Sequence, residues 1–192
     1  MMRIITGKAK GIRLKTLEGD ATRPTSERVK EAVFSMIQFD VEGRSVLDLF
    51  AGSGQLGLES LSRGAMEATF VDKSKDAVAI IKENIQKTRF LDQSEVYQSD
   101  SINFLSRCGS KKFDIVFLDP PYALKLYNPA LKAMLDKNIL KPTSIIICES
   151  GTDAIFDGDT ALEARFIVDK KTQYSKTVIT ILRPNFNEAD NG

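Results

Sequence analysis

The hydrophobic and polar positions of the chain alternate between two patterns, and each pattern predicts a different kind of element. Short segments rich in apolar residues are typical of strands. The last two of these segments are expected to form an antiparallel pair at the end of the chain. Seven segments have this character: 46–50, 68–72, 95–98, 113–118, 144–148, 166–168 and 177–182.

Between these strands, apolar residues recur with helical spacing. The clearest helix is expected to begin after Ser74, which is a favoured N-cap residue, and its apolar positions are Ala77, Ile80, Ile81 and Ile85. Further helices are expected directly after the glycine turn, near Ser101, and over 129–137. The regular alternation of strand and helix predicts an α/β fold with a parallel sheet covered by helices.

Three parts of the chain are expected from this pattern. Residues 1–40 are predicted to be an amino-terminal extension made of a hairpin and a helix, 41–183 the main α/β core, and 184–192 a loose tail. The hairpin is expected because Ile4-Ile5 and the Ile12–Leu14 segment flank the loop 7–11. Basic residues outnumber acidic ones in this extension, which favours docking to RNA phosphates, although a solvated polar surface is the alternative.

Within that basic extension, Arg23-Pro24-Thr25 gives the clearest structural signal. The proline predicts a rigid turn, and Thr25 or Ser26 is expected to cap the helix that follows. Arg23 and Arg28 would then lie about one helical turn apart, a spacing that suits bidentate bonds to a phosphate. The alternative is that these arginines pair with nearby acids such as Glu27 or Glu31.

Composition restricts the chemistry further. The 192 residues are expected to form one domain, and the absence of histidine excludes histidine metal sites, Ser-His-Asp triads and histidine bases. Two cysteines, Cys108 and Cys148, fit a reducing cytosol better than a disulfide scaffold. No apolar run approaches the roughly twenty residues of a membrane span, and no signal-peptide core follows the first residues. We therefore expect a cytoplasmic protein without a metal, and a monomer by default.

A glycine turn follows the first strand of the core. Its spacing, Gly52-x-Gly54-x-x-Gly57, is formally that of a dinucleotide-binding loop, and Asp72 ends the next strand at the distance expected for an acid that binds ribose hydroxyls. NAD and S-adenosylmethionine both contain such a nucleoside. Asp48, just before the glycines, would repel a pyrophosphate and suits a cationic amino-acid group instead. The pattern therefore favours S-adenosylmethionine.

The fourth strand, 113–118, ends in Asp119-Pro120-Pro121-Tyr122. Two prolines cannot continue a sheet and have no N–H donors, so the turn presents a carboxylate, unpaired carbonyls and an aromatic ring. We expect Asp119 and the Pro120 carbonyl to accept hydrogen bonds from an exocyclic amine and Tyr122 to stack on its base. A plain turn after a strand is the alternative explanation of this motif.

Together these motifs resemble those of a known family. Asp48-x-Phe50-Ala51-Gly52-Ser53-Gly54, the acid Asp72 and Asp119-Pro120-Pro121-Tyr122 are similar to the motifs of class I Rossmann-like amino-group methyltransferases. The segments 3–11 and 22–31 resemble the bacterial RsmD family, and the resemblance covers about residues 2–183. It implies a mostly parallel seven-stranded sheet and methylation of the exocyclic N2 of one guanine in small-subunit (16S) ribosomal RNA, within a ribosomal subunit or an assembly intermediate.

The resemblance also assigns roles to residues of this chain. The catalytic group is expected at Asp119, Pro120, Pro121 and Tyr122. The residues expected to bind S-adenosylmethionine are Asp48, Phe50, Gly52, Ser53, Gly54, Asp72, Lys73, Asp100 and Ser101. Asp100 has a second interpretation, as the N-cap of the helix near Ser101. The residues expected to bind the RNA are Arg3, Lys10, Arg23, Thr25 and Arg28.

Three other functions remain compatible with parts of the pattern. DNA adenine-N6 methyltransferases also carry Asp-Pro-Pro-Tyr, although they usually add a target-recognition region that this chain lacks. An NAD(P)-dependent oxidoreductase would need a proton donor, for which Tyr122 or Tyr174 with a lysine would have to serve. An RNA-binding module without activity would leave Asp48, Asp72 and Asp119 without a purpose and opposed to RNA binding.

Overall fold

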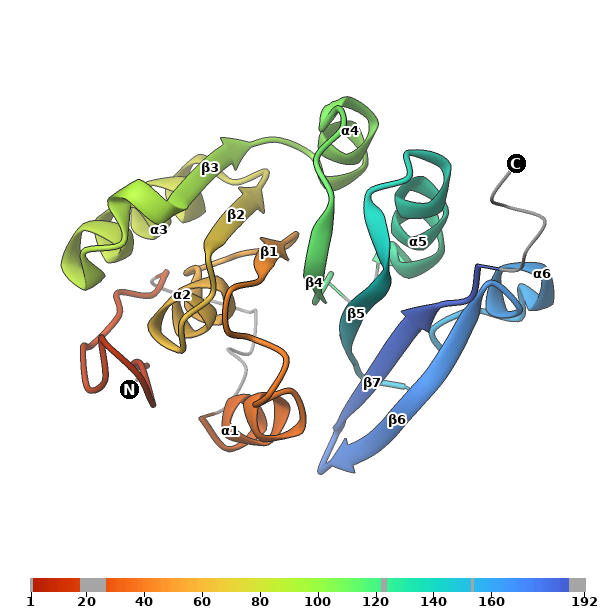
Figure 1. Cartoon of the computed structure of the whole chain (residues 1–192), viewed down its shortest axis with the longest axis horizontal. Coiled ribbons are helices and arrows are strands. Elements are labelled where there is room, and N and C mark those ends of the chain that lie inside the picture. The colour runs from red at the N-terminus through yellow and green to blue at the C-terminus, as the bar shows by residue number, and fades with distance from the viewer. Residues whose placement is uncertain (1, 18–26, 122–123, 153, 187–192) are drawn as a thin grey trace.

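The computed structural model of the chain describes residues 2–17, 27–121, 124–152 and 154–186 (Figure 1). A mostly parallel seven-stranded sheet forms its centre, as expected, and its strand order is β3-β2-β1-β4-β5-β7-β6. The strands are β1 (Ser45–Asp48), β2 (Glu67–Asp72), β3 (Ser94–Gln98), β4 (Phe113–Leu118), β5 (Leu140–Ser150), β6 (Phe166–Tyr174) and β7 (Thr177–Pro184). The helices are α1 (Glu27–Met36), α2 (Gln55–Ser62), α3 (Lys75–Thr88), α4 (Ser101–Arg107), α5 (Tyr127–Asp136) and α6 (Thr160–Glu163), with a 3-10 turn η1 (Leu91–Gln93).

Strands β1 to β5 are parallel, and β7 runs antiparallel between β5 and β6, which confirms the expected terminal pair. β6 is longer than the segment 166–168 predicted from its apolar residues. Its middle is exposed, so apolar patterning covers only its start. The exposed middle is held by backbone pairing with β7, a contact that composition does not reveal.

The two faces of the sheet are covered by different helices (Figure 1). Because successive side chains of a strand point to opposite faces, Val46 packs with residues of α1, α2 and α3, whereas Leu47 packs with residues of α4, α5 and α6. β4 follows the same rule with Phe117 and Val116. Both faces are therefore buried, which explains why the central strands are apolar at nearly every position.

Local sequence signals predicted the position of α3 well. Ser74 caps α3 by accepting a hydrogen bond from the backbone N–H of Ala77, and the four predicted apolar positions of this helix are buried. The predicted amino-terminal hairpin forms around one antiparallel bridge between Arg3 and Arg13, with backbone bonds of 3.0 Å from the Ile4 N–H to the Ile12 carbonyl and from the Leu14 N–H to the Met2 carbonyl. The loop 7–11 packs on α2, where the Lys8 N–H donates to the Ser62 carbonyl.

A buried ion pair ties the amino-terminal segment to the core. The side chains of Lys30 on α1 and Glu59 on α2 are fully buried, with Nζ 3.3 Å from Oε2. Glu59 also accepts hydrogen bonds from the backbone N–H groups of Ile5 and Thr6 and from the guanidinium of Arg63. Lys30 donates to the carbonyl of Arg3 at 2.6 Å.

This network makes residues 2–14 part of the same core as the sheet, since Ile4, Ala9 and Leu14 are buried in the cluster that contains β1 and α2. The division of the chain at residue 40 stays a prediction. β7 continues to Pro184, the first residue of the predicted tail, and 187–192 lie outside the described residues. In the part of the chain that the structure describes, no helix has the length and apolar character to cross a membrane.

Replacing Lys30 by methionine is expected to lower the free energy of unfolding by about 3–5 kcal/mol, because it leaves the buried Glu59 carboxylate without one of its two cations. Urea denaturation measures the difference. Lys82→Met, at an exposed position of α3, is the matched control and should change the free energy by less than about 0.5 kcal/mol. Equal effects of the two substitutions would contradict a structural role for the buried pair.

Candidate active site

A cavity of about 1250 Å³ opens at the carboxyl ends of the parallel strands. It lies where the strand order reverses between β1 and β4, because β2 and β3 continue on one side and β5 on the other. Ligands of open α/β sheets bind at such a reversal, since the loops after the two strands diverge there. Among the residues that the structure describes, five acids line the cavity: Asp48, Asp72, Asp100, Asp119 and Glu149.

The glycine turn between β1 and α2 forms one wall. Gly54 has φ 77°, a conformation that glycine adopts without strain, and it precedes the first residue of α2. Gly57 is required for a different reason, since a Cβ there would lie 2.3 Å from the ring of Phe70 on β2. Gly52 and Ser53 line the cavity, whereas Gly54 is buried beneath it, so the structure gives Gly54 a conformational role.

Asp48 lies at the end of β1, below the glycine turn. Its carboxylate is 3% exposed and accepts a hydrogen bond of 3.0 Å from the backbone N–H of Gly57. Burial raises the pKa of Asp48 to about 7; the Gly57 bond opposes this shift and the charge of Asp72 adds to it. A cation in the cavity would stabilise the charged form of this carboxylate.

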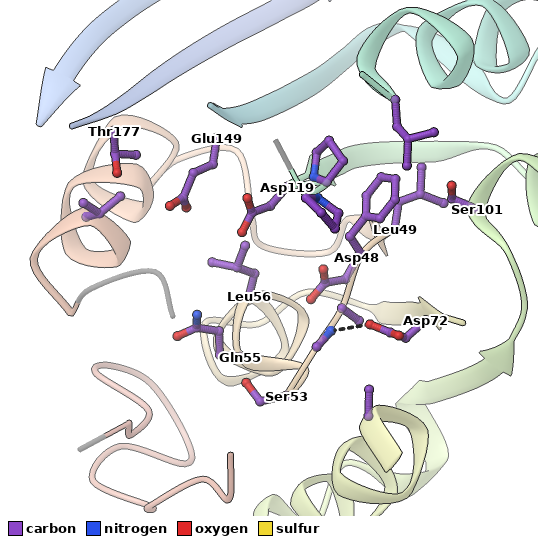
Figure 2. Close-up of a pocket in the computed structure, with 18 of the residues that line it drawn as sticks. Asp48, Leu49, Ser53, Gln55, Leu56, Asp72, Ser101, Asp119, Glu149 and Thr177 are labelled. Atoms are coloured by element: carbon purple, nitrogen blue, oxygen red, sulfur yellow. Dashed lines mark hydrogen bonds between the residues drawn. The ribbon is translucent and has the colours of Figure 1, made fainter. Parts of the chain in front are cut away.

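Asp72 joins the loops that follow β1 and β2. One carboxylate oxygen accepts from the Gly52 N–H at 2.9 Å, drawn in Figure 2, and the other accepts from the Ser74 N–H at 2.8 Å. A carboxylate has further acceptor sites, so Asp72 can accept additional hydrogen bonds on the side that faces the cavity. Lys73 and Phe50 line the cavity beside it.

Asp100 confirms its second interpretation, as an N-cap, and it also has a place at the cavity. It caps α4, since one of its oxygens accepts from the backbone N–H groups of Ile102 and Asn103 at 3.0 and 3.1 Å, and it also lines the cavity. Ser101 next to it is buried at the same wall. Within the described residues its hydroxyl has no hydrogen-bond partner, so it is able to bond to a group in the cavity.

Asp119, Pro120 and Pro121 form the opposite wall, directly after β4. The pKa of Asp119 is held well above its ordinary value, first by burial and then by the charges of Glu149 and Asp48. Tyr122, the fourth residue of the motif, lies outside the described residues.

Glu149 is the acid that the sequence analysis missed. It lies near the end of β5, is 8% exposed, and points into the same space as Asp119 (Figure 2). The hydroxyl of Tyr127 donates to its backbone carbonyl. A sequence signal existed, because Glu149 directly follows the apolar run 145–148, just as Asp119 follows 115–118.

The residues expected to bind RNA are only partly brought together. Arg28 is exposed and lines the cavity. Arg3 is paired with Glu27, with Nε 3.2 Å from the carboxylate, and Lys10 is exposed; neither lines the cavity. Arg23 and Thr25 lie outside the described residues. Over the same part of the chain, no group of histidine, cysteine, aspartate and glutamate side chains is arranged to hold a metal ion.

Comparisons with known proteins agree with this architecture. The family model described as Conserved hypothetical protein 95 matches residues 2–183. Ribosomal RNA small subunit methyltransferase D of Haemophilus influenzae is 38% identical over 154 residues, which cover 79% of this chain and 80% of the relative. Putative rRNA methyltransferase YlbH of Bacillus subtilis is 37% identical over 150 residues, covering 77% and 82%. The structure of the putative methyltransferase yhhF from Escherichia coli has a TM-score of 0.84 at 27% identity, covering 97% and 99%.

The sheet and the comparisons define a class I, S-adenosylmethionine-dependent methyltransferase. Within this class, the chain belongs to the family described as Conserved hypothetical protein 95, the RsmD family. The methyltransferase class argues against the two hypotheses of an NAD(P)-dependent oxidoreductase and of an RNA-binding module without activity.

The raised pKa of Asp48 predicts a pH dependence of stability. The folded protein retains a proton on Asp48 between about pH 4 and 7, where the unfolded chain has lost it, so the free energy of unfolding falls as pH rises through this window. The slope is about 1.4 kcal/mol per pH unit for one full proton. Asp48→Asn keeps an acceptor for the Gly57 N–H and should flatten the slope in urea denaturation series at pH 4, 5, 6 and 7.

Asp92→Asn, at an exposed position, is the matched control and should leave the wild-type slope. Asp119 adds a slope of the same sign, so the Asp48 variant retains part of the dependence. An unchanged slope in Asp48→Asn would show that this carboxylate is ionised in the folded protein across the window.

Proposed function

We propose that the protein methylates the exocyclic N2 amine of a guanine in small-subunit ribosomal RNA. The observation that carries this proposal is one cavity, lined on one side by the glycine turn and Asp72 and on the other by Asp119-Pro120-Pro121. A nucleoside cofactor and a flat base carrying an amine therefore have adjacent walls. The relatives named as ribosomal RNA small subunit methyltransferase D support ribosomal RNA as the substrate.

The residues on the glycine side fit S-adenosylmethionine. Asp48 with the backbone at Gly52 and Ser53 would hold the amino-acid end, and Asp72 with Lys73 the ribose. Phe50, Asp100 and Ser101 would hold the adenine, and the partnerless buried hydroxyl of Ser101 supports this assignment. The acid-rich wall suits a cation, and the bound cofactor supplies an electrophilic methyl group on a sulfonium.

The other wall holds and orients the base. Asp119 accepts a hydrogen bond from the target base, and the Pro120 carbonyl accepts from its amine. These hydrogen bonds polarise the N–H bonds of the amine and favour the tetrahedral nitrogen of the transition state. Tyr122 stacks on the base, which is turned out of its helix or loop. Fixing the amine in line is worth about 7–11 kcal/mol in similar intramolecular reactions. The amine proton then leaves to Asp119 or to water.

The RNA surrounding the target guanine would contact the amino-terminal basic residues. Arg28 lies at the cavity and is the first of these to meet a phosphate near the flipped base. Arg3, Lys10, Arg23 and Thr25 would extend the contact. So small a protein has little surface for recognising sequence, so a ribosomal subunit or an assembly intermediate in the cytoplasm is the proposed substrate, and a monomer the proposed active form.

The direct test incubates the protein with methyl-labelled S-adenosylmethionine and small ribosomal subunits from cells that lack this gene. Nuclease digestion and mass spectrometry then identify the labelled nucleoside. N2-methylguanosine at one site is the expected product. Label in N6-methyladenine, or label only when DNA is supplied, would overturn the proposed base and substrate while leaving a methyltransferase.

Two substitutions test the proposed roles of the two cavity walls independently. Asp119→Ala is expected to lower turnover by at least about a hundredfold because it removes an acceptor for the reacting base, while the Kd for S-adenosylmethionine stays within about threefold. Asp72→Ala is expected to weaken cofactor binding, measured by calorimetry, because it removes the acceptor for the ribose and the link to Gly52. If Asp119→Ala retained turnover, the proposed role of Asp119 would be wrong.

A further inference from the structure

Glu149 adds a second carboxylate to the wall that is proposed to hold the base. It belongs to β5, and Asp119 directly follows β4, the neighbouring parallel strand. The register pairs Leu118 with Cys148, so the two acids occupy equivalent positions on adjacent strands, which lie about 4.8 Å apart. Figure 2 shows both carboxylates directed into the same part of the cavity, with Thr177 of β7 beside Glu149.

Because Glu149 is buried, its carboxylate strongly favours a ligand group that donates a hydrogen bond. Its side chain is 8% exposed, and its charge contributes to the raised pKa of Asp119. An ionised carboxylate accepts hydrogen bonds and donates none, and it has about four acceptor positions, so existing contacts leave room for a ligand. A buried acceptor that faces another acceptor costs free energy, because water cannot replace the missing donor.

Two adjacent carboxylates complement an edge that carries two neighbouring donors. Guanine presents such an edge, because its ring N1–H is next to the N2 amine. Adenine presents an amine next to N1, which is an acceptor and would face a carboxylate. A single carboxylate at Asp119 distinguishes these edges less well, because it can be satisfied by the amine alone.

We infer that Glu149 selects guanine by accepting the N1–H of the target base while Asp119 accepts from its N2 amine. This inference rests on the proposed function and assigns base selection within that same site. Sites built to bond a donor reject an analogue that lacks it by as much as about 10⁴–10⁵-fold. Glu149 contacts the base but not the transferred methyl group, so it acts on base choice and Asp119 on the reacting amine.

The test replaces the target guanine by 2-aminopurine, which keeps the N2 amine but has an acceptor at N1. Small subunits are reconstituted with ribosomal RNA that carries either base at the target position, introduced by ligation. Wild-type protein is expected to methylate the guanine subunits with a kcat/KM at least about 10³-fold above the 2-aminopurine subunits.

Glu149→Gln is expected to reduce this preference by about a hundredfold or more, because the amide can donate to the N1 of 2-aminopurine. Its Kd for S-adenosylmethionine, measured by calorimetry, should match that of the wild type, which also shows that the variant is folded. Glu149→Asp keeps the carboxylate and should keep the preference for guanine at a lower rate. Thr177→Val alters the same region of the cavity without removing a charge and should also keep the preference.

An unchanged preference in Glu149→Gln, with wild-type activity on guanine, would overturn the role of Glu149 and leave the proposed function intact. Wild-type protein that methylates neither kind of subunit would instead overturn the proposed function, and the inference with it. The two failures are therefore distinguished by the activity of the unsubstituted protein.

Discussion

The structure depends on the concentration of acidic side chains at one edge of its sheet. Asp48, Asp119 and Glu149 lie at or near the carboxyl ends of three adjacent parallel strands, and the charges of Asp48 and Glu149 both raise the pKa of Asp119. Parallel strands place their carboxyl ends together, so the fold itself brings these like charges into one buried place. Their mutual repulsion and lost hydration are relieved by retaining a proton, by a cation or by hydrogen-bond donors. The edge therefore suits the positively charged cofactor of this class.

The buried carboxylate on α2 is compensated in a different way from the acids of the cavity. Glu59 is fully buried, but it accepts two backbone N–H bonds and is paired with Lys30 and Arg63. All the compensation comes from the protein, which makes this carboxylate a structural anchor for the amino-terminal segment. Because α2 also begins at the glycine turn, the basic segment and the cofactor wall are attached to one rigid helix.

More of the residues that line the glycine-turn side of the cavity than of those near Asp119 were predictable from the sequence. The glycine turn, Asp72 and Asp100 can be recognised from residues a few positions away in the sequence. The hydrogen bonds that Asp72 accepts from Gly52 and Ser74, and that Asp100 accepts from Ile102, are also local or join consecutive loops. Glu149 was missed because a lone acid after an apolar run has no motif of its own. Its suggested role depends on its position next to Asp119, which lies thirty positions earlier in the chain. Only the pairing of the two strands reveals that these acids are neighbours. Arg3 and Lys10 were assigned from charge and from the family resemblance of their segment, and neither predicts where a side chain lies relative to a cavity.

What the sequence determined by itself is local in origin. Apolar runs, the cap at Ser74 and the turn imposed by two prolines follow from the residues immediately around them, so strands, helices and the α/β class were predictable. The order of the strands, the pairing of Lys30 with Glu59 and the convergence of Glu149 with Asp119 were decided only by the tertiary structure. These contacts join segments far apart in the chain, and their free energy depends on burial and on low dielectric surroundings, which exist only after the sheet and helices have packed together.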